Sequence, residues 1–333
     1  MMSNAQNNAQ QPWAVEVKQL SVVFDDFYAV KNVTFSVKRG EIFGFLGANG
    51  AGKTTTIRVL CGLLNPSEGE VRVGGILFEN GVSEKKIKEK VGYMSQRLTL
   101  YPDLTVEENL AFTASLRKLS KRQYHHQRDE ILAFISFQQP RSTLVQSLSG
   151  GMKQQVSLAA SLLHDPEIVF LDEPTAGVTP ASREKFWALI KKIAESGRTV
   201  FVTSHYMDEV EQCDRIALMR FGEIVALDSP ENLKMHLFPE GVYECRPKRS
   251  MAYAEIQALR KRTEFEFFEP FGLRFHASFK KTPEAESLRK SLSDDFDMEK
   301  IKATLEDVFI RTVESRGDQA FGDKASGERE AVQ

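Results

Sequence analysis

Short apolar runs alternate with amphipathic stretches along most of the chain, between residues 13 and 230. The runs IFGFL, IVFL and VFVTS are continuous, which is typical of parallel strands covered on both faces. Strands are expected at 13–24, 33–37, 41–47, 70–75, 91–96, 167–174, 199–205 and 215–228. Helical patterns occur at 53–64, 106–119, 151–164, 182–196 and 207–214. This alternation predicts an α/β domain with a mainly parallel sheet and an antiparallel β portion at its N-terminus.

The pattern changes at both ends of this domain, which is predicted over residues 13–230. Residues 1–12 are rich in Asn and Gln, and residues 316–333 are polar with several glycines. Both tails are therefore expected to be disordered. The helix-rich span 103–147 interrupts the alternation of strands and helices, and a helical subdomain is predicted at about 97–160.

Residues 231–315 are predicted to form a small α/β accessory domain without candidate chemistry. Proline and glycine divide 265–279 into two strands around a turn. The first strand is expected to place Phe265 and Phe267 on one face, and the second Leu273, Phe275, Ala277 and Phe279. Thr282 is the expected N-cap of a helix that begins at Pro283, and a last short helix is expected at 304–314. Core packing is the expected role of the aromatic side chains.

Composition narrows the classes to which the chain can belong. Of its 333 residues, 41% are hydrophobic and 27% are charged, as in ordinary soluble proteins with a packed core. The net charge of −2 gives no general attraction to nucleic acid or anionic lipid. Three scattered cysteines, without a CxxC pair, argue against a disulfide framework or a zinc site and are typical of a reducing cytosol.

The sequence also lacks the usual signs of membrane insertion. No apolar run approaches the ~20 residues that span a bilayer. The polar N-terminus has neither the basic region nor the apolar core of a signal peptide. A function at a membrane would therefore need another protein as the anchor.

The segment GANGAGKT at 47–54 matches the phosphate-binding pattern G-x-x-x-x-G-K-[ST]. It follows a predicted strand and opens a predicted helix, the context in which the pattern binds nucleotide. Its glycines let backbone amides approach phosphate oxygens, and Lys53 reaches the β- and γ-phosphates. Thr54 offers a hydroxyl to Mg²⁺, and Thr55 is a candidate donor to the α-phosphate. The predicted nucleotide-binding residues here are Gly47, Asn49, Gly50, Ala51, Gly52, Lys53, Thr54 and Thr55.

Asp172 and Glu173 end a buried strand, where a pair of carboxylates is costly unless a cation or hydrogen bonds compensate it. Asp172 is a candidate Mg²⁺ ligand, and Glu173 a candidate base for an attacking water molecule. The alternative is an Asp-Glu-Pro turn without chemistry. The intact phosphate loop upstream favours the catalytic interpretation.

A second anion-binding pattern, LSGG at 148–151, precedes another predicted helix. Together with the motifs above it resembles the ABC-type ATPases, over about residues 15–230. The resemblance implies that two ATPase subunits pair head to tail, so that Ser149, Gly150 and Gly151 of one subunit cap the γ-phosphate of ATP held by the other. It also implies ATP and Mg²⁺ as cofactors, a second ATPase subunit and an integral membrane permease as partners, and a place on the cytoplasmic face of the inner membrane. No nucleic-acid partner is expected.

The same resemblance gives roles to individual positions. Phe24 matches the aromatic residue that stacks on adenine, with Tyr28 as a weaker candidate and core packing as the alternative for both. Gln96 matches the glutamine that senses Mg²⁺ and water. His205 matches the histidine that contacts the γ-phosphate, which makes Glu173, His205 and Gln96 the predicted catalytic residues.

Several positions depart from the common family pattern. Thr179 stands where Asp is usual, Ser95 where proline is common, and Met152 where Gln is frequent. Met152 and the tail LEDVFI at 305–310 resemble the bacterial ABC-2-type exporters of drugs and lipids. This resemblance predicts an exporter subunit.

Two other functions remain open on sequence grounds. A soluble ABC ATPase acting on nucleic acid or ribosomes is the alternative, although the chain has one cassette, no long coiled-coil insertion and a near-neutral charge. A different P-loop enzyme, such as a kinase or GTPase, would leave LSGG and His205 without a role, and the guanine-reading NKxD pattern is absent from the sequence.

Overall fold

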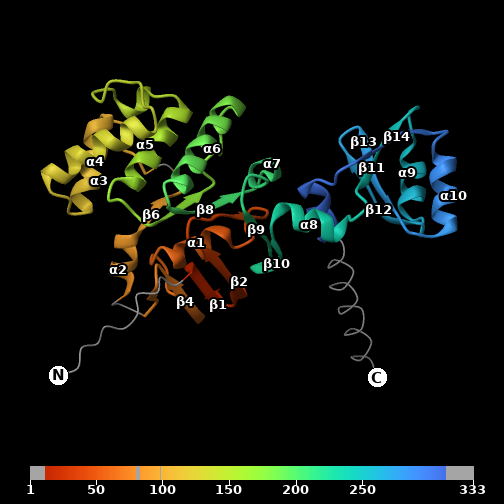
Figure 1. Cartoon of the computed structure of the whole chain (residues 1–333), viewed down its shortest axis with the longest axis horizontal. Coiled ribbons are helices and arrows are strands. Elements are labelled where there is room, and N and C mark those ends of the chain that lie inside the picture. Colours follow the sequence, from red (N-terminus) through yellow and green to blue (C-terminus); the bar gives the residue numbers. More distant parts are fainter. Residues whose placement is uncertain (1–11, 80–82, 98, 313–333) are drawn as a thin grey trace. The chain divides into compact units, whose positions relative to one another are not determined.

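The computed structural model describes residues 12–79, 83–97 and 99–312 (Figure 1). It divides into two compact units, Met1–Leu227 and Asp228–Gln333. Apart from residue 12, the predicted tails at 1–12 and 316–333 lie outside the described residues. Among the residues described, every helix is too short or too polar to serve as a transmembrane span. All three cysteines are buried free thiols.

A six-stranded sheet forms the centre of the first unit. Its strands, in spatial order, are β10 (Glu223–Asp228), β9 (Arg215–Arg220), β3 (Ile42–Leu46), β8 (Thr199–Ser204), β7 (Ile168–Asp172) and β6 (Val91–Met94). The pairs β9–β3, β3–β8, β8–β7 and β7–β6 are parallel. Every residue of β3, β7 and β8 is buried, which explains their continuous apolar sequences. The predicted α/β class with a mainly parallel sheet is confirmed.

A four-stranded sheet of antiparallel pairs accompanies the central sheet. It contains β2 (Phe27–Lys38), β1 (Trp13–Phe24), β4 (Glu68–Val73) and β5 (Ile76–Leu77), in that order. Helix α1 (Lys53–Leu60) contacts strands of both sheets. Buried side chains of the two sheets belong to one core cluster that includes Phe35, Phe43 and Phe201.

Three helices, coloured from gold to yellow-green in Figure 1, form a group within the first unit. They are α3 (Val106–Leu116), α4 (Lys121–Phe134) and α5 (Gly150–Leu162), and α5 contacts the other two. Thr105 and Ser120 begin α3 and α4 with capping boxes, which satisfy free amides of the first turn. Helix α5 also contacts β6 and α6 (Pro180–Glu195), so this group is anchored to the central sheet.

The second unit has its own antiparallel sheet, in the order β12 (Phe265–Phe271), β13 (Arg274–Phe279), β11 (Val242–Pro247) and β14 (Phe296–Ile301). Helices α9 (Tyr253–Arg260) and α10 (Pro283–Leu292) contact β12 and β13, respectively. Helix α8 (Pro230–Leu237) precedes the sheet and a helical segment at 305–312 follows it. Phe265, Phe268 and Phe275 form the centre of the core, as expected for these aromatic side chains. Thr282 caps α10, as predicted.

Some sequence expectations were wrong. Leu273 is 95% exposed, because it follows Gly272 in the turn and β13 begins only at Arg274. The single strand expected at 215–228 is two strands, β9 and β10, separated by a turn. The helix expected at 207–214 is the short α7 (Met207–Val210). The missed elements are α2 (Ser83–Lys90), α4, α8, α9, β5, β11 and β14.

Candidate functional site

The motifs of the first unit meet at one edge of its central sheet. The phosphate loop follows β3, Gln96 follows β6, Asp172 ends β7, and His205 follows β8. These four strands are consecutive and parallel, so their carboxyl ends lie at the same edge. Crevices at this edge are where open α/β sheets bind ligands.

Glycine is sterically required in the phosphate loop. Gly52 has φ +103° and directly precedes α1, and a Cβ on it would lie 2.5 Å from the carbonyl oxygen of Ala29. A Cβ on Gly47 would lie 2.4 Å from the carbonyl oxygen of Met219. Both contacts are to backbone, which cannot move aside cheaply, so only glycine allows this close approach.

Lys53 is nearly inaccessible to solvent, with 4% exposure. Its Nζ donates hydrogen bonds to the carbonyl oxygens of Gly47 (2.7 Å) and Ala48 (3.2 Å), and lies 3.5 Å from Glu173 Oε1. Burial lowers the pKa of Lys53 below its ordinary value, while the charges of Glu173 and Asp172 act in the opposite direction.

Asp172 is completely buried, and hydroxyl groups hold its carboxylate. Its Oδ1 accepts hydrogen bonds from Thr203 Oγ1 (2.7 Å) and Thr54 Oγ1 (3.2 Å), and its Oδ2 accepts one from Tyr93 Oη (3.5 Å). Burial, and then the charge of Asp172, raise the pKa of Tyr93 above its ordinary value, so Tyr93 remains a neutral donor.

Glu173 is the point at which the predicted catalytic residues come together. Gln96 Nε2 donates a 2.9 Å hydrogen bond to Glu173 Oε2, and His205 Nδ1 lies 3.4 Å from the same oxygen without hydrogen-bond geometry. The backbone of Glu173 has φ +48°, and its amide donates a 2.9 Å bond to Thr203 Oγ1. A left-handed conformation in a residue other than glycine costs roughly 1–3 kcal/mol, and strained backbone of this kind is frequent at functional sites.

The charges at this edge favour an added cation. Two nearly inaccessible carboxylates, on Asp172 and Glu173, stand beside one ammonium group, on Lys53. A buried carboxylate without a full counter-charge is costly. The oxygen atoms of Thr54 and Asp172, which lie 3.2 Å apart, are the hard ligands that Mg²⁺ prefers. The donor set therefore fits magnesium.

Ser149 and the two glycines after it begin α5. Ser149 is exposed, and its Oγ accepts a hydrogen bond from the Met152 amide at 3.4 Å, as an N-cap does. A Cβ on Gly151 would lie 3.0 Å from Ser182 Oγ, so this end of α5 lies against the start of α6. Thr179 caps α6, where its Oγ1 accepts from the Ser182 amide. Thr179, which departs from the pattern expected from the resemblance, therefore serves as a helix cap.

Comparison with known proteins identifies the family to which this chain belongs. The family profile described as "ABC transporter" matches residues 30–176. The Nod factor export ATP-binding protein I of Burkholderia lata is 31% identical over 301 residues, which are 89% of this chain and 96% of that protein. The chain belongs to the ABC transporter family. The probable multidrug ABC transporter ATP-binding protein YbhF of Escherichia coli is 42% identical over 245 residues, 74% of this chain. The matched part of this chain spans 41% of the length of that relative.

Solved structures agree with this ABC assignment. The cbiO1 protein of Clostridium perfringens, described as part of an ABC transporter complex, has a TM-score of 0.62 and 25% identity, and the match covers 76% of this chain and 96% of that one. A dimeric ATP-binding cassette in a post-hydrolysis state, bound to ADP and Pi, has a TM-score of 0.59 and 28% identity. That match covers 65% of this chain and 98% of that one. The predicted P-loop ATPase fold is confirmed.

The ABC cassette presents exposed aromatic rings in the turn between β1 and β2. Phe24 is 47% exposed and Tyr28 is 46% exposed, so the alternative of core packing is wrong for both. Phe27, which pairs with Phe24 across the turn, is 65% exposed. The prediction for Phe24 as an adenine-stacking residue remains a prediction.

Sequence reasoning missed several polar residues that support the carboxylates of the ABC cassette. Thr203 bonds both Asp172 and the Glu173 amide, and Tyr93 reaches Asp172 from β6. Glu209 is buried behind this site, in α7. Polar side chains in the otherwise apolar runs VGYM and VFVTS were the available signal, since buried polar groups need partners.

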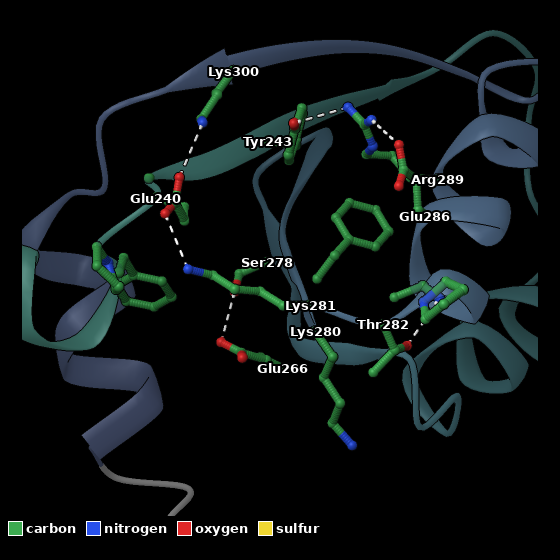
Figure 2. A pocket seen from close by; sticks show the side chains of 16 residues that line it. Glu240, Tyr243, Glu266, Ser278, Lys280, Lys281, Thr282, Glu286, Arg289 and Lys300 are labelled. Carbon is green, nitrogen blue, oxygen red and sulfur yellow. Dashed lines mark hydrogen bonds and ion pairs between the residues drawn. The ribbon is translucent and has the colours of Figure 1, made fainter.

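A separate pocket of about 670 Å³ lies in the second unit (Figure 2). Figure 2 shows Lys281 and Lys300 reaching Glu240 from two sides, with nitrogen–oxygen distances of 3.2 and 3.7 Å. Arg289 pairs with Glu286 in the same way. These charged groups are solvent-exposed and compensate one another, so they do not define the chemistry of a ligand.

Proposed function

We propose that this ABC subunit binds and hydrolyses ATP as one of a pair of ATPase subunits. Closure of the pair would drive a separate membrane permease, from the cytoplasmic face of the inner membrane. The observation that carries the proposal is the convergence of Lys53, Gln96 and His205 on the carboxylate of Glu173. The names of the relatives support export in particular, because they include multidrug and Nod factor export proteins.

Glu173 is proposed as the group that accepts the proton of the attacking water. The Gln96 amide fixes the orientation of Oε2, and Oε1 faces the ammonium group of Lys53. His205, next to Oε2, is placed to orient the water and to contact the γ-phosphate. These groups hold the base in position before the reaction, which is how a site lowers the cost of reorganisation.

Thr54 and Asp172 are proposed to hold Mg²⁺, and Gln96 is proposed as a further ligand of the ion or of its water. Bound there, the ion would neutralise charge on the β- and γ-phosphates. Thr203 keeps Asp172 in place through its 2.7 Å hydrogen bond. Backbone amides of Gly47 to Thr55 would surround the phosphates, with Phe24 stacking on adenine.

Ser149 and Gly150, which are exposed, and Gly151, which is half-buried, are proposed to cap ATP held by the second subunit. They begin a helix, where free amides and the helix dipole favour an anion. Their exposure supports an intermolecular role, because such amides otherwise face only water. ATP would then favour the closed pair, and hydrolysis would remove that preference.

The test is Glu173→Gln, with Glu167→Gln as the matched control. Both residues flank β7, but Glu167 precedes the strand and is paired with Lys90 at 2.8 Å on the surface. Turnover of Glu173→Gln, measured by phosphate release, is expected to fall by at least about 100-fold, as for loss of a general base. ATP and Mg²⁺ should convert this variant to a stable dimer in light scattering.

The control should keep both the turnover and the monomer–dimer behaviour of the original chain. A Glu173→Gln variant that hydrolyses ATP at the original rate, or stays monomeric with ATP and Mg²⁺, would contradict the proposal. Phosphate release measured with the membrane permease reconstituted in vesicles would test whether ATP hydrolysis is coupled to that protein.

A further inference from the structure

Behind the site lies a buried carboxylate for which the proposed chemistry has no role. Glu209, in α7, is 1% exposed. A buried charge of this kind is retained only where hydrogen bonds and an opposite charge compensate the loss of water. The partners of Glu209 therefore indicate what it holds together.

Two hydroxyl groups donate hydrogen bonds to Glu209. Thr175 Oγ1 donates to Oε1 at 2.5 Å, and Ser204 Oγ donates to Oε2 at 2.6 Å. Arg183 adds an ion pair, with its Nε 3.1 Å from Oε1. These partners come from the turn after β7, the end of β8 and the first turns of α6, so one carboxylate joins three elements.

Each hydroxyl lies within two residues of a member of the proposed site. Ser204 directly precedes His205, and its Oγ also accepts a 2.9 Å hydrogen bond from the Tyr206 amide. The backbone on both sides of His205 is thereby tied to Glu209. Thr175 is two residues from Glu173, in the turn whose strained backbone presents that carboxylate.

Contacts through the Tyr206 ring extend the same support to the His205 side chain. The ring centroids of His205 and Tyr206 lie 4.1 Å apart at a tilt of 38°, and the guanidinium of Arg183 lies 4.0 Å from the Tyr206 centroid. Because Glu209 is the buried partner of Arg183, it holds the guanidinium at the far side of the Tyr206 ring.

We propose that Glu209 is a positioning residue that sets the orientation of His205 and Glu173 for ATP hydrolysis. The inference rests on the proposed function. Its effect falls on turnover and not on nucleotide affinity, because its partners belong to the far side of the carboxylate site and not to the phosphate loop at 47–54. Direct contact with the nucleotide plays no part in this role.

The first test is Glu209→Gln, which keeps the side-chain volume but loses the charge that faces Arg183. The kcat for ATP is expected to fall by about tenfold or more, with KM and the affinity for a fluorescent ATP analogue within twofold of the original. Asp208→Asn is the matched control. Asp208 is the adjacent carboxylate and faces the same guanidinium at 3.7 Å, but 74% of its side chain is exposed, so its removal should leave kcat unchanged.

Ser204→Ala provides the second test and applies even if Glu209→Gln does not fold. It deletes the two hydrogen bonds of Ser204 Oγ beside His205, the one donated to Glu209 and the one accepted from the Tyr206 amide. The same fall in kcat at constant KM is expected. A merely structural role would lower the melting temperature and the nucleotide bound per chain together with kcat. That outcome, or a kcat within twofold of the original in Ser204→Ala, would overturn the inference. Failure of the proposed function is distinguishable, because the unmodified chain would then show no ATPase activity.

Discussion

His164 offers a quantitative test of how burial controls charge in the first unit. It follows α5, and its Nε2 lies 3.0 Å from the Val91 carbonyl oxygen, to which the neutral ring donates. Its Nδ1 is buried without a hydrogen-bond partner among the described residues. Burial, with Arg117 nearby, lowers the pKa of His164 to about 4, from an ordinary value of 6.5.

The sign of the effect follows from proton binding. Between pH 6.5 and pH 4 the unfolded chain binds this proton and the folded chain does not, so stability falls as the pH drops through that interval. The contribution is fully present above pH 6.5. The pKa difference corresponds to at most about 3 kcal/mol, of which about 2 kcal/mol is lost at pH 5.

The perturbation is His164→Gln, which keeps an N–H group for the Val91 carbonyl and cannot titrate. Urea unfolding followed by tryptophan fluorescence reports on the first unit, because both tryptophans, Trp13 and Trp187, belong to it. Between pH 7 and pH 5 the original chain should lose about 2 kcal/mol more of its unfolding free energy than the variant. His126→Gln, at an exposed imidazole, should behave as the original chain does.

Equal losses in the original chain and in His164→Gln would refute the reasoning. So would NMR titration, if the imidazole signal that disappears in the variant titrated near pH 6.5. The buried ring should instead remain neutral until about pH 4.

Two other predictions test separate parts of the molecule. Ser149→Arg should lower ATPase activity at least tenfold. A single chain should still bind a fluorescent ATP analogue within twofold of the original affinity, because Ser149 lies outside the phosphate loop. Loss of that binding would contradict the proposal that Ser149 acts on ATP held by the second subunit. Thr282→Ala should lower the stability of the second unit by about 1 kcal/mol in thermal unfolding, because it removes the N-cap of α10. Thr282→Ser should retain most of that stability, and identical melting temperatures for the two variants would count against the capping role.

The sequence by itself determined the features that depend on neighbouring residues. The continuous apolar runs indicated buried parallel strands, and β3, β7 and β8 are indeed covered throughout. The phosphate loop and the cap at Thr282 were recognisable because their residues act on backbone groups only a few positions away. Local patterns failed where a turn interrupts a run, as at Leu273.

Only the tertiary structure decided which distant groups meet. Gln96 and Glu173 are 77 positions apart, yet the parallel pairing of β6 and β7 brings them to 2.9 Å. The burial of Glu209 among Thr175, Ser204 and Arg183 likewise depends on the packing of α6 and α7 beside β8. A sequence reveals the conformational preference of each segment and the spacing of its hydrophobic residues. Contacts across a sheet depend instead on the order and register of the strands, which no single segment specifies.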